Sequence, residues 1–463
     1  MIYNVDNCPF NPREYETAKK KGNRGTKQSR KYINVVCAFD IETTRLPEIE
    51  QSFMYVWQMQ LDNYTLIGRT WEEFLSYAKK LSALAGERTL VIYVHNLSFE
   101  FQFLQGVYNF NSDDVFAIDS RKILKCIMYN NIEFRCSYIH SNMSLDVFTR
   151  KMGCETKKLT GTFDYEKKRY VDTVLDETEI AYCINDVISL VEAIKREMQR
   201  DDDNIATIPL TSTGYVRREA KRTMRTMNGF YSWIRDQLPD YDLFTVLAEA
   251  FRGGNTHASR FYSNKVLENV QSIDRSSSYP DVLVNRKFPS SKFRYREQLS
   301  YDDLINEINK RGKAAVFRIS FTGLFLTDSF TPCPYLTKDK SRNIINGEFD
   351  NGRILSADEL TTTLTDLDFK IVCYQYSWNT VKIYDVYTAR YAYLPNCFRD
   401  LVKYYYKQKT ELKGASGDDA IYYDKFKNMI NALYGMTAQS PVKQNIIYSK
   451  ELFGLYKEDD RPP

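Results

Sequence analysis

The chain has 463 residues, of which 43% are hydrophobic and 27% are charged, and its formal net charge is +4. This composition is typical of a soluble globular protein of two to four domains and argues against a disordered or fibrous chain. No apolar window is long enough to cross a bilayer and no signal-peptide core is present, so we expect a cytosolic protein with no membrane partner. Nine scattered cysteines without a CxxC pair, and only three histidines, argue against a disulfide framework and a zinc site.

Basic residues are concentrated in three runs, at 19–31, 217–225 and 403–413. Such runs are most often solvated faces or tails. The chain also contains 35 tyrosines, and aromatic rings interleaved with Lys and Arg offer stacking surfaces together with phosphate contacts. This combination favours a nucleic-acid-binding protein. Residues 1–32 are polar, basic and without periodicity, which predicts a flexible arm.

Two carboxylates follow the first apolar run of the chain. Residues 35–39 (VVCAF) predict a buried strand, and Asp40 and Glu42 stand at its end. Residues two apart on a strand point to the same face, so these carboxylates are expected to lie side by side. A divalent cation bound between them would relieve their mutual repulsion, so the pair predicts a metal site. The alternative is a strand that ends in a solvated acidic turn.

The next segments alternate between strand and helix patterns, which predicts an α/β domain. We expect a helix over 144–152 and a long helix over 177–200, whose first turn is acidic and whose later half is basic. Tyr182 and Asp186 lie four residues apart in that helix and so share one face, although such pairs also occur by chance. The remaining expected elements are strands at 53–61, 89–94, 114–127 and 132–137 and a helix at 71–84. Glu100 is a further acid just past the end of one of these strands.

A basic helical segment over 213–235 precedes the sequence Phe251-Arg252-Gly253-Gly254. Paired glycines let a backbone approach a phosphate chain closely, and Arg252 would supply positive charge. A simple glycine-containing loop is an equally good interpretation of these residues alone.

Residues 270–274 predict a short strand that carries Asp274 at its end, before a serine-rich turn. A carboxylate beside exposed backbone amides could hold a metal ion and its phosphates, whereas the alternative is an acid that caps an ordinary turn. Further strands are expected at 314–325 and 370–376.

The helix expected over 424–433 carries two stripes of side chains. Lys427, Asn431 and Tyr434 recur at helical spacing, and an apolar stripe lies beside them, made of Phe426, Met429, Ile430 and Leu433. A lysine, an amide and a ring along one edge suit a nucleotide. The alternative is an amphipathic surface helix.

Six of these motifs occur in the order found in family B DNA polymerases of the protein-primed branch. FDIETT, HNLSFE and YCIND resemble the three exonuclease motifs of that family. FRGG resembles its YxGG element, IDRSSSYP its palm motif Dx2SLYP, and KNMINALYG its motif Kx3NSxYG. The resemblance extends from about residue 35 to about residue 440 and implies a DNA polymerase with a 3′–5′ proofreading exonuclease.

The resemblance implies a role for each residue of the exonuclease motifs. Asp40, Glu42 and Asp186 would bind two Mg²⁺ or Mn²⁺ ions, and Tyr182 would position the attacking water. Glu100 stands where the family has aspartate, and its extra methylene changes the metal spacing and hence the expected rate. The residues implied to grip single-stranded DNA are Asn96, Phe99 and Ser137.

The polymerase motifs imply a second two-metal site. Asp274 would bind the metal ions that carry the incoming nucleotide, and Tyr279 would lie under its sugar. Lys427 would contact the triphosphate, whereas Asn431 and Tyr434 would line the nascent base pair. Arg252, Gly253 and Gly254 would contact DNA.

The implied fold is an α/β exonuclease domain, with an RNase H-like mixed sheet and flanking helices, followed by an α+β partial palm and fingers. The expected domains are a basic arm (1–32), the exonuclease (33–205), a linker with the YxGG-like element (206–260), palm, insertion and fingers (261–440), and a tail (441–463).

The family also needs a motif YxDTD, which is expected after KNMINALYG and is not found in the remaining residues. We therefore expect an incomplete polymerase site, residues 456–460 as a solvated tail, and a second polypeptide as a supplier of the motif. The expected partners are primer-template and single-stranded DNA, deoxynucleoside triphosphates and a priming terminal protein. Two alternatives remain: a free-standing DEDD-type 3′–5′ exonuclease and a non-catalytic replication factor that binds DNA or the terminal protein.

Overall fold

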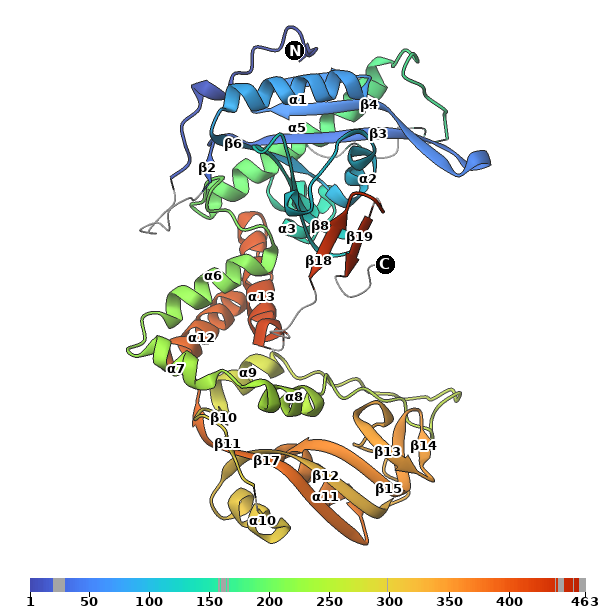
Figure 1. Cartoon of the computed structure of the whole chain (residues 1–463), viewed down its shortest axis with the longest axis vertical. Helices are drawn as coiled ribbons and strands as arrows, with labels where there is room; N and C mark the ends of the chain where they lie inside the picture. Colours follow the sequence, from blue (N-terminus) through green and yellow to red (C-terminus); the bar gives the residue numbers. More distant parts are fainter. Residues whose placement is uncertain are drawn as a thin grey trace. The chain divides into compact units, whose positions relative to one another are not determined.

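A computed structural model describes residues 1–19, 30–156, 159, 164, 166–297, 299–437, 439, 445–452 and 454–457 (Figure 1). The chain forms two compact units. Unit 1 consists of residues 1–219 and 408–463, and unit 2 of residues 220–407. The boundaries fall within helices α6 (Ser212–Met224) and α12 (Asn396–Glu411).

Unit 1 is built on a mixed sheet of nine strands, which run in the order β1-β5-β4-β3-β6-β9-β8-β7, with β2 also paired to β6. The strands are β1 (Ile2–Tyr3), β2 (Lys31–Tyr32), β3 (Cys37–Leu46), β4 (Gln51–Leu61), β5 (Tyr64–Gly68), β6 (Arg88–Val94), β7 (Val115–Asp119), β8 (Lys122–Met128) and β9 (Ile132–Cys136). The central strand β3 is antiparallel to β4 and parallel to β6, and β6 is parallel to β9. This confirms the mixed sheet that the sequence predicts.

Helices cover both faces of this sheet. The helices of unit 1 are α1 (Trp71–Ala85), α2 (Leu97–Val107), α3 (Ser137–Ser141), α4 (Leu145–Lys151), α5 (Glu177–Arg200), the first part of α6, the end of α12, and α13 (Asp418–Thr437). Its 3-10 helices are η1 (Pro12–Glu14), η2 (Pro47–Ile49) and η3 (Ser112–Asp114). Helix α5 begins at a capping box of Asp176 and Glu179 and spans the range expected from its acidic first turn.

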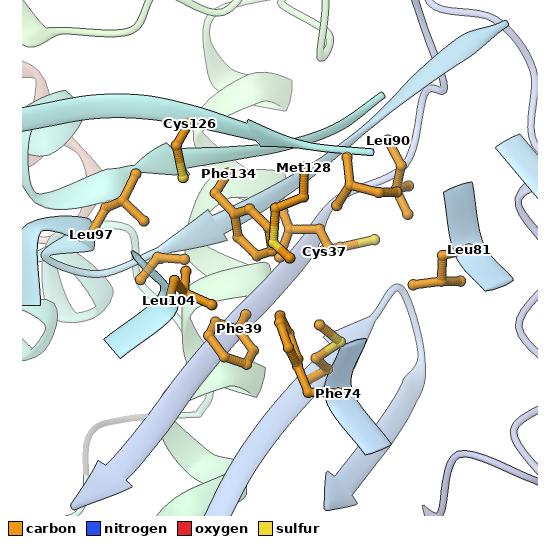
Figure 2. Close-up of a cluster of buried hydrophobic side chains, with 14 of the residues drawn as sticks. Cys37, Phe39, Phe74, Leu81, Leu90, Leu97, Leu104, Cys126, Met128 and Phe134 are labelled. Atoms are coloured by element: carbon orange, nitrogen blue, oxygen red, sulfur yellow. The ribbon is translucent and has the colours of Figure 1, made fainter. Parts of the chain in front are cut away.

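Alternation along β3 assigns its side chains to the two faces. Cys37 and Phe39 belong to the buried cluster on the face that α1 and α2 cover. The rings of Phe39 and Phe74 lie 4.8 Å apart there (Figure 2). Each fully buried side chain of this size contributes about 1.5–3 kcal/mol of transfer free energy. Because side chains alternate, Ala38 faces the opposite side.

The opposite face of the sheet packs against α4 and α5. Val36, which precedes β3, and Ala38 of β3 share a buried cluster with Val187 and Leu190 of α5 and with Phe148 of α4. Since Asp40 and Glu42 follow Ala38 at intervals of two, the strand directs them toward the same side as α5.

Both ends of the chain contribute to the core of unit 1. The sequence predicts a flexible arm at 1–32, whereas residues 1–19 add strand β1 and bury Cys8 and Phe10. The expectation of a solvated tail around residue 456 is wrong for Tyr456, because β19 (Gly454–Lys457) pairs with β18 (Ile446–Ser449). Tyr448 is 1% exposed in that hairpin, which is red in Figure 1. Residues 458–460 lie outside the described part of the chain.

Unit 2 contains a sheet of eight strands in the order β10-β17-β12-β15-β13, with β11, β14 and β16 paired alongside. The strands are β10 (Lys287–Pro289), β11 (Arg294–Tyr295), β12 (Lys313–Leu326), β13 (Ser341–Ile345), β14 (Glu348–Asp350), β15 (Arg353–Thr365), β16 (Tyr376–Ser377) and β17 (Thr380–Tyr393). Its helices are the end of α6, α7 (Phe230–Gln237), α8 (Tyr241–Ala250), α9 (Ser278–Asn285), α10 (Tyr301–Asn309), η4 (Lys338–Lys340), α11 (Asp366–Gln375) and most of α12.

Two predicted strands of unit 2 are wrong. Residues 270–274 form no strand, because no described strand pairs with them. A strand needs such a neighbour, since its backbone N–H and C=O groups would otherwise lack hydrogen-bond partners. Ile273 is 93% exposed there. Residues 370–375 belong to helix α11, because Thr365 and Asp368 form a capping box and buried Phe369 and Val372 recur at helical spacing.

No helix in the described part of the chain is long and apolar enough to cross a membrane.

Candidate active site

The first pair of predicted site residues lies within a strand, not beyond its end. Strand β3 continues to Leu46, so Asp40 and Glu42 stand in its middle, next to a bulge after Glu42. Both are partly exposed. Their face of the sheet is covered by α5, which buries Tyr182 (4% exposed) and Asp186 (8% exposed).

The second group comes from the junction between β6 and α2. Ala38 of β3 pairs with Tyr93 of β6, so Asp40 is level with the residues at which β6 ends and α2 begins. Asn96 precedes α2 with φ 75°, a left-handed conformation, and is exposed. Phe99 is 43% exposed in the first turn, whereas Glu100 is only 3% exposed.

These three elements, together with Leu145 of α4, line one open cavity of about 200 Å³. Its lining consists of Phe39, Asp40, Ile41, Glu42, His95, Asn96, Phe99, Glu100, Leu145, Tyr182, Asp186, Val187 and Leu190. The structure thus brings together all the residues of the predicted exonuclease site except Ser137.

Negative charge accumulates in this cavity. Burial, and then the charge of Asp40, raise the pKa of Glu100 well above its usual value. The thiol of Cys183 lies behind the cavity on α5, and burial, followed by the charges of Glu42, Asp40 and Asp186, raises its pKa. The site therefore favours a bound positive charge or a proton shared between carboxyl groups.

The donor set of the cavity suits Mg²⁺ or Mn²⁺, which prefer carboxylate oxygens. Buried Glu100 shares a hydrogen bond with Asp40, so carboxyl groups from α2 and β3 lie in contact in this cavity. In the described residues, no three His, Cys, Asp or Glu side chains are placed so that they could hold a metal ion as they stand. Side-chain rotations would therefore accompany binding of a cation.

Two residues that sequence reasoning misses support the cavity. Gln58 of β4 pairs with Asp40 across the strands, and its Nε2 donates a 3.0 Å hydrogen bond to Asp40 Oδ2. Strand β4 also contains Gln51, Ser52 and Gln60, so its composition does not single out Gln58, and only the strand register identifies it. His95 lines the cavity, and its Nδ1 lies 3.0 Å from Ser137 Oγ. Ser137 itself is fully buried and also donates to the Val94 carbonyl oxygen, so the structure places it behind His95.

The residues predicted for the polymerase site divide between the two units. In unit 2, Asp274 is exposed in an irregular segment, and Tyr279 is 49% exposed in the first turn of α9. Arg275 donates a 2.7 Å hydrogen bond to Asp281 of α9. The predicted strand before Asp274 is absent, so Asp274 does not stand at the end of a strand.

The other predicted nucleotide contacts lie on α13 in unit 1. Lys427 and Asn431 are exposed and Tyr434 is partly buried, whereas the neighbouring stripe of Met429, Ile430 and Leu433 is buried. The two-stripe pattern is thus confirmed for these residues, whereas Phe426 of the predicted apolar stripe is only partly buried. The helix is longer than predicted and extends to Thr437.

A larger cavity of about 420 Å³ in unit 1 contains none of the predicted site residues. Its polar lining is paired internally: His140 Nε2 lies 2.6 Å from Glu197 Oε2, and Asp201 pairs with Arg200 and with Lys425 of α13. Lys151 and Asp424 form a further ion pair of 2.5 Å. These pairs attach α13 to the helices of unit 1.

Comparison with known proteins gives consistent results. A family described as DNA polymerase type B, organellar and viral, matches residues 114–461. Phi29 DNA polymerase complexed with single-stranded DNA has a similar structure, with a TM-score of 0.64 and 16% identity over 89% of this chain and 69% of that chain. Phi29 DNA polymerase with primer-template DNA and incoming nucleotide substrates gives a TM-score of 0.63 at 17% identity over 88% and 68%. No curated protein sequence matches. At 16–17% identity, the structural similarity to these polymerases shows a shared fold. It confirms the predicted fold class, an α/β domain followed by an α+β part.

Proposed function

The chain belongs to the organellar and viral type B DNA polymerases, and from that premise we propose that residues 33–205 act as a 3′–5′ exonuclease that proofreads DNA during viral or plasmid replication. One observation carries the proposal: Asp40, Glu42, Glu100, Tyr182 and Asp186 come from three separate elements and line one cavity.

We assign Asp40, Glu42 and Asp186, with Glu100, to the binding of Mg²⁺ or Mn²⁺. Divalent cations in such a site polarise the scissile phosphate and lower the pKa of bound water. Gln58 fixes the orientation of Asp40 by its hydrogen bond. Buried Tyr182 lies on the same helical face as Asp186 and is suited to orient the attacking water.

The mouth of the cavity suits the 3′ end of a DNA strand. Asn96 and Phe99 line the cavity and are exposed, so an amide and an aromatic ring are available to a terminal nucleotide. Stacking of a base on an aromatic side chain contributes about 1–3 kcal/mol and tolerates any base. His95 also lines the cavity, and its hydrogen bond with Ser137 Oγ fixes the position of the imidazole ring.

For the rest of the chain we propose a polymerase role, with a linker at 206–260 and palm, insertion and fingers at 261–440. Asp274 would bind metal ions, and Tyr279, Lys427, Asn431 and Tyr434 would contact the incoming nucleotide. The proposed partners are primer-template DNA, deoxynucleoside triphosphates and a terminal protein. Primer extension that is lost in Asp274→Ala tests this part.

The exonuclease is tested with a 5′-labelled single-stranded oligonucleotide and Mg²⁺ or Mn²⁺. We expect the purified chain to shorten it from the 3′ end, and Asp40→Asn to lower the rate by roughly 10³-fold or more. Asp119→Asn is the matched control, because Asp119 is exposed on β7, away from the cavity.

The same assay separates the alternatives. Degradation without any nucleotide incorporation would favour a free-standing exonuclease. DNA binding without degradation, unchanged in Asp40→Asn, would contradict the proposal and favour a non-catalytic replication factor.

A further inference from the structure

Helix α13 belongs to unit 1, the unit of the exonuclease cavity, although it carries three residues that we assign to the incoming nucleotide. Lys427, Asn431 and Tyr434 recur at helical spacing and share one stripe of the helix, on which Lys427 and Asn431 are exposed. We call these three residues the nucleotide stripe. Other residues of α13 contact α4 and the end of α5, so the exonuclease helices hold the helix that carries the nucleotide stripe.

The first turns of α13 pack on the core of the exonuclease. Ile421 is partly buried against the apolar cluster that contains Phe148 of α4 and Val187 and Leu190 of α5. Val187 and Leu190 also line the exonuclease cavity. The same cluster therefore supports the cavity and the beginning of α13.

Two ion pairs of opposite polarity attach the next turn of α13. Lys151 Nζ of α4 lies 2.5 Å from Asp424 Oδ2, and the two side chains are 30% and 38% exposed. Lys425 Nζ pairs with Asp201, the residue at which α5 ends, and the Asp201 side chain is 4% exposed. Burial raises the pKa of Asp201, but its hydrogen bond to Arg200 and the charges of Arg200 and Lys425 outweigh burial and lower it. Asp201 is therefore ionised at neutral pH.

The order of the charges specifies how α13 is rotated. Asp424 and Lys425 are consecutive, and each contacts a residue of opposite charge on a different helix. A shift of α13 by one residue would place Asp424 opposite Asp201, and two like charges in contact at an interface repel each other strongly. The two pairs thus select one rotation of the helix about its axis.

Apolar packing contributes less to this part of the contact. The cavity of about 420 Å³ adjoins the two ion pairs, and Asp424, Lys425, Asn428 and Met429 form its α13 side. Atoms that line a cavity lack van der Waals partners on one side, so the attractive energy of close packing is smaller there. The ion pairs consequently carry a larger share of the attachment.

We propose that Lys151 and Asp201 are positioning residues for nucleotide binding. Through their ion pairs they fix the rotation of α13, and with it the direction in which the nucleotide stripe faces a deoxynucleoside triphosphate. Two residues of the exonuclease domain then support part of the polymerase site of the same chain. The inference rests on the nucleotide-binding role proposed for the stripe.

Charge reversal tests the pair of Lys151 and Asp424. In Lys151→Asp two carboxylates oppose each other, and the added substitution Asp424→Lys restores an ion pair of reversed polarity. Asp146→Asn is the matched control, because Asp146 pairs with Arg150 at 2.7 Å within α4 and the pair involves no residue of α13. Binding of fluorescently labelled dATP to the full chain with Mg²⁺ is measured by anisotropy. The exonuclease rate and the hydrogen exchange of residues 420–434 are measured on the same preparations.

We expect Lys151→Asp to weaken binding of labelled dATP roughly tenfold and to speed exchange of residues 420–434. The double variant should return the Kd to within about twofold of the wild type and slow the exchange again. The exonuclease rate should stay unchanged in both, because neither residue lines the exonuclease cavity. Asp146→Asn should match the wild type in all three measurements.

Lys425→Met tests the second ion pair with little risk to the fold. The substitution keeps an apolar stem of similar length and leaves Asp201 paired with Arg200 at 3.0 Å. We expect weaker binding of labelled dATP and faster exchange, as in Lys151→Asp. Lys427→Met should weaken binding at unchanged exchange, because it removes a proposed phosphate contact and no attachment of α13.

Faster exchange with an unchanged Kd in Lys151→Asp would overturn the inference, because the ion pairs would then stabilise the fold alone. Absence of rescue in the double variant would overturn it too, as would a parallel loss of exonuclease activity and nucleotide binding. Failure of the wild type to bind labelled dATP, or normal binding by Lys427→Met, would refute the proposed nucleotide-binding role and the inference with it. The exchange data would still report the attachment of α13.

Discussion

Gln58 donates a 3.0 Å hydrogen bond from Nε2 to Oδ2 of Asp40 across the pair β3–β4. A bond of this kind fixes the rotamer of a carboxylate that is proposed to bind metal, and loss of such a supporting partner typically costs roughly 10- to 100-fold in activity or metal affinity. We expect Gln58→Met, which keeps the volume but removes the donor, to lower the exonuclease rate by that factor. The measurement is single-turnover degradation as a function of Mn²⁺ concentration.

Gln51→Met is the control for this substitution, since Gln51 is exposed at the start of the same strand. A Gln58→Met enzyme with wild-type rate and Mn²⁺ dependence would show that Asp40 needs no such support.

Bound cations should stabilise unit 1, because the cavity concentrates carboxylates around the buried Glu100. At a Mn²⁺ concentration of 100 times Kd, linkage adds about 2.7 kcal/mol to the free energy of unfolding. We expect the Tm of the wild type to rise with Mn²⁺ and to return on chelation. Asp186→Asn should remove most of this rise. An equal rise in Asp186→Asn would place the bound ions elsewhere.

The buried pair of His140 and Glu197 predicts a pH dependence of stability. Burial alone would lower the pKa of His140, but the charge of Glu197, its hydrogen bond and that of the Pro209 carbonyl raise it. Because the pKa of His140 is higher in the folded than in the unfolded protein, the pair makes its full contribution to the free energy of unfolding at pH values below the unfolded pKa of about 6.5. This contribution is lost as the pH rises through the pKa of His140 in the folded protein. Glu197→Gln should therefore cost about 3 kcal/mol at pH 6 and less at pH 9, measured by urea unfolding.

Glu192→Gln on the same helix gives the comparison for this pH dependence. Glu192 pairs with Arg196 at 2.9 Å, and an arginine keeps its charge throughout this range, so its cost should not vary with pH. A Glu197→Gln cost that is constant from pH 6 to pH 9 would show that His140 does not titrate with the pair.

Tyr448 should be the main anchor of the hairpin β18–β19. Its ring is 1% exposed and packs edge-on against Phe101 at 5.5 Å, and its carbonyl oxygen accepts a 2.6 Å hydrogen bond from Ser112. We expect Tyr448→Ala to lower the free energy of unfolding by about 3–5 kcal/mol. Leu452→Ala, at a side chain that is 42% exposed, should change it by less than about 0.5 kcal/mol. Equal effects of the two substitutions would mean that the hairpin does not contribute to the core.

Local patterns are sufficient to predict much of unit 1. The apolar runs at β3, β4 and β6 and the capped α5 have strong periodicity, and spacing alone places Asp40 with Glu42 and Tyr182 with Asp186. Only the family resemblance predicts that these pairs line one cavity. The local sequence cannot, because the order of the strands in the sheet depends on pairing between distant segments.

The errors arise where nonlocal contacts decide the outcome. Residues 270–274 contain only two apolar residues, Val270 and Ile273, and no described strand pairs with them. The capping box of Thr365 and Asp368 begins a helix in a run that looks like a strand. The sequence predicts that Arg252 contacts DNA, whereas the structure directs its guanidinium against β15. This placement depends on a hydrogen bond to the carbonyl oxygen of Thr363, more than one hundred residues away, which no local pattern indicates. Gln58 escapes prediction for the same reason, since its role depends on strand register.

The docking of β18 on the sheet of unit 1 also affects how the protein is made. Unit 1 is discontinuous in sequence, so its first segment leaves the ribosome while Tyr448, part of its core, has not been synthesised. Translation of the roughly 230 residues from Ala220 to Tyr448 takes on the order of 11 to 46 seconds at about 5–20 residues per second. The first segment of unit 1 must therefore wait with the Phe101–Phe110 side of its core uncovered, and transiently exposed apolar surface of this kind promotes aggregation.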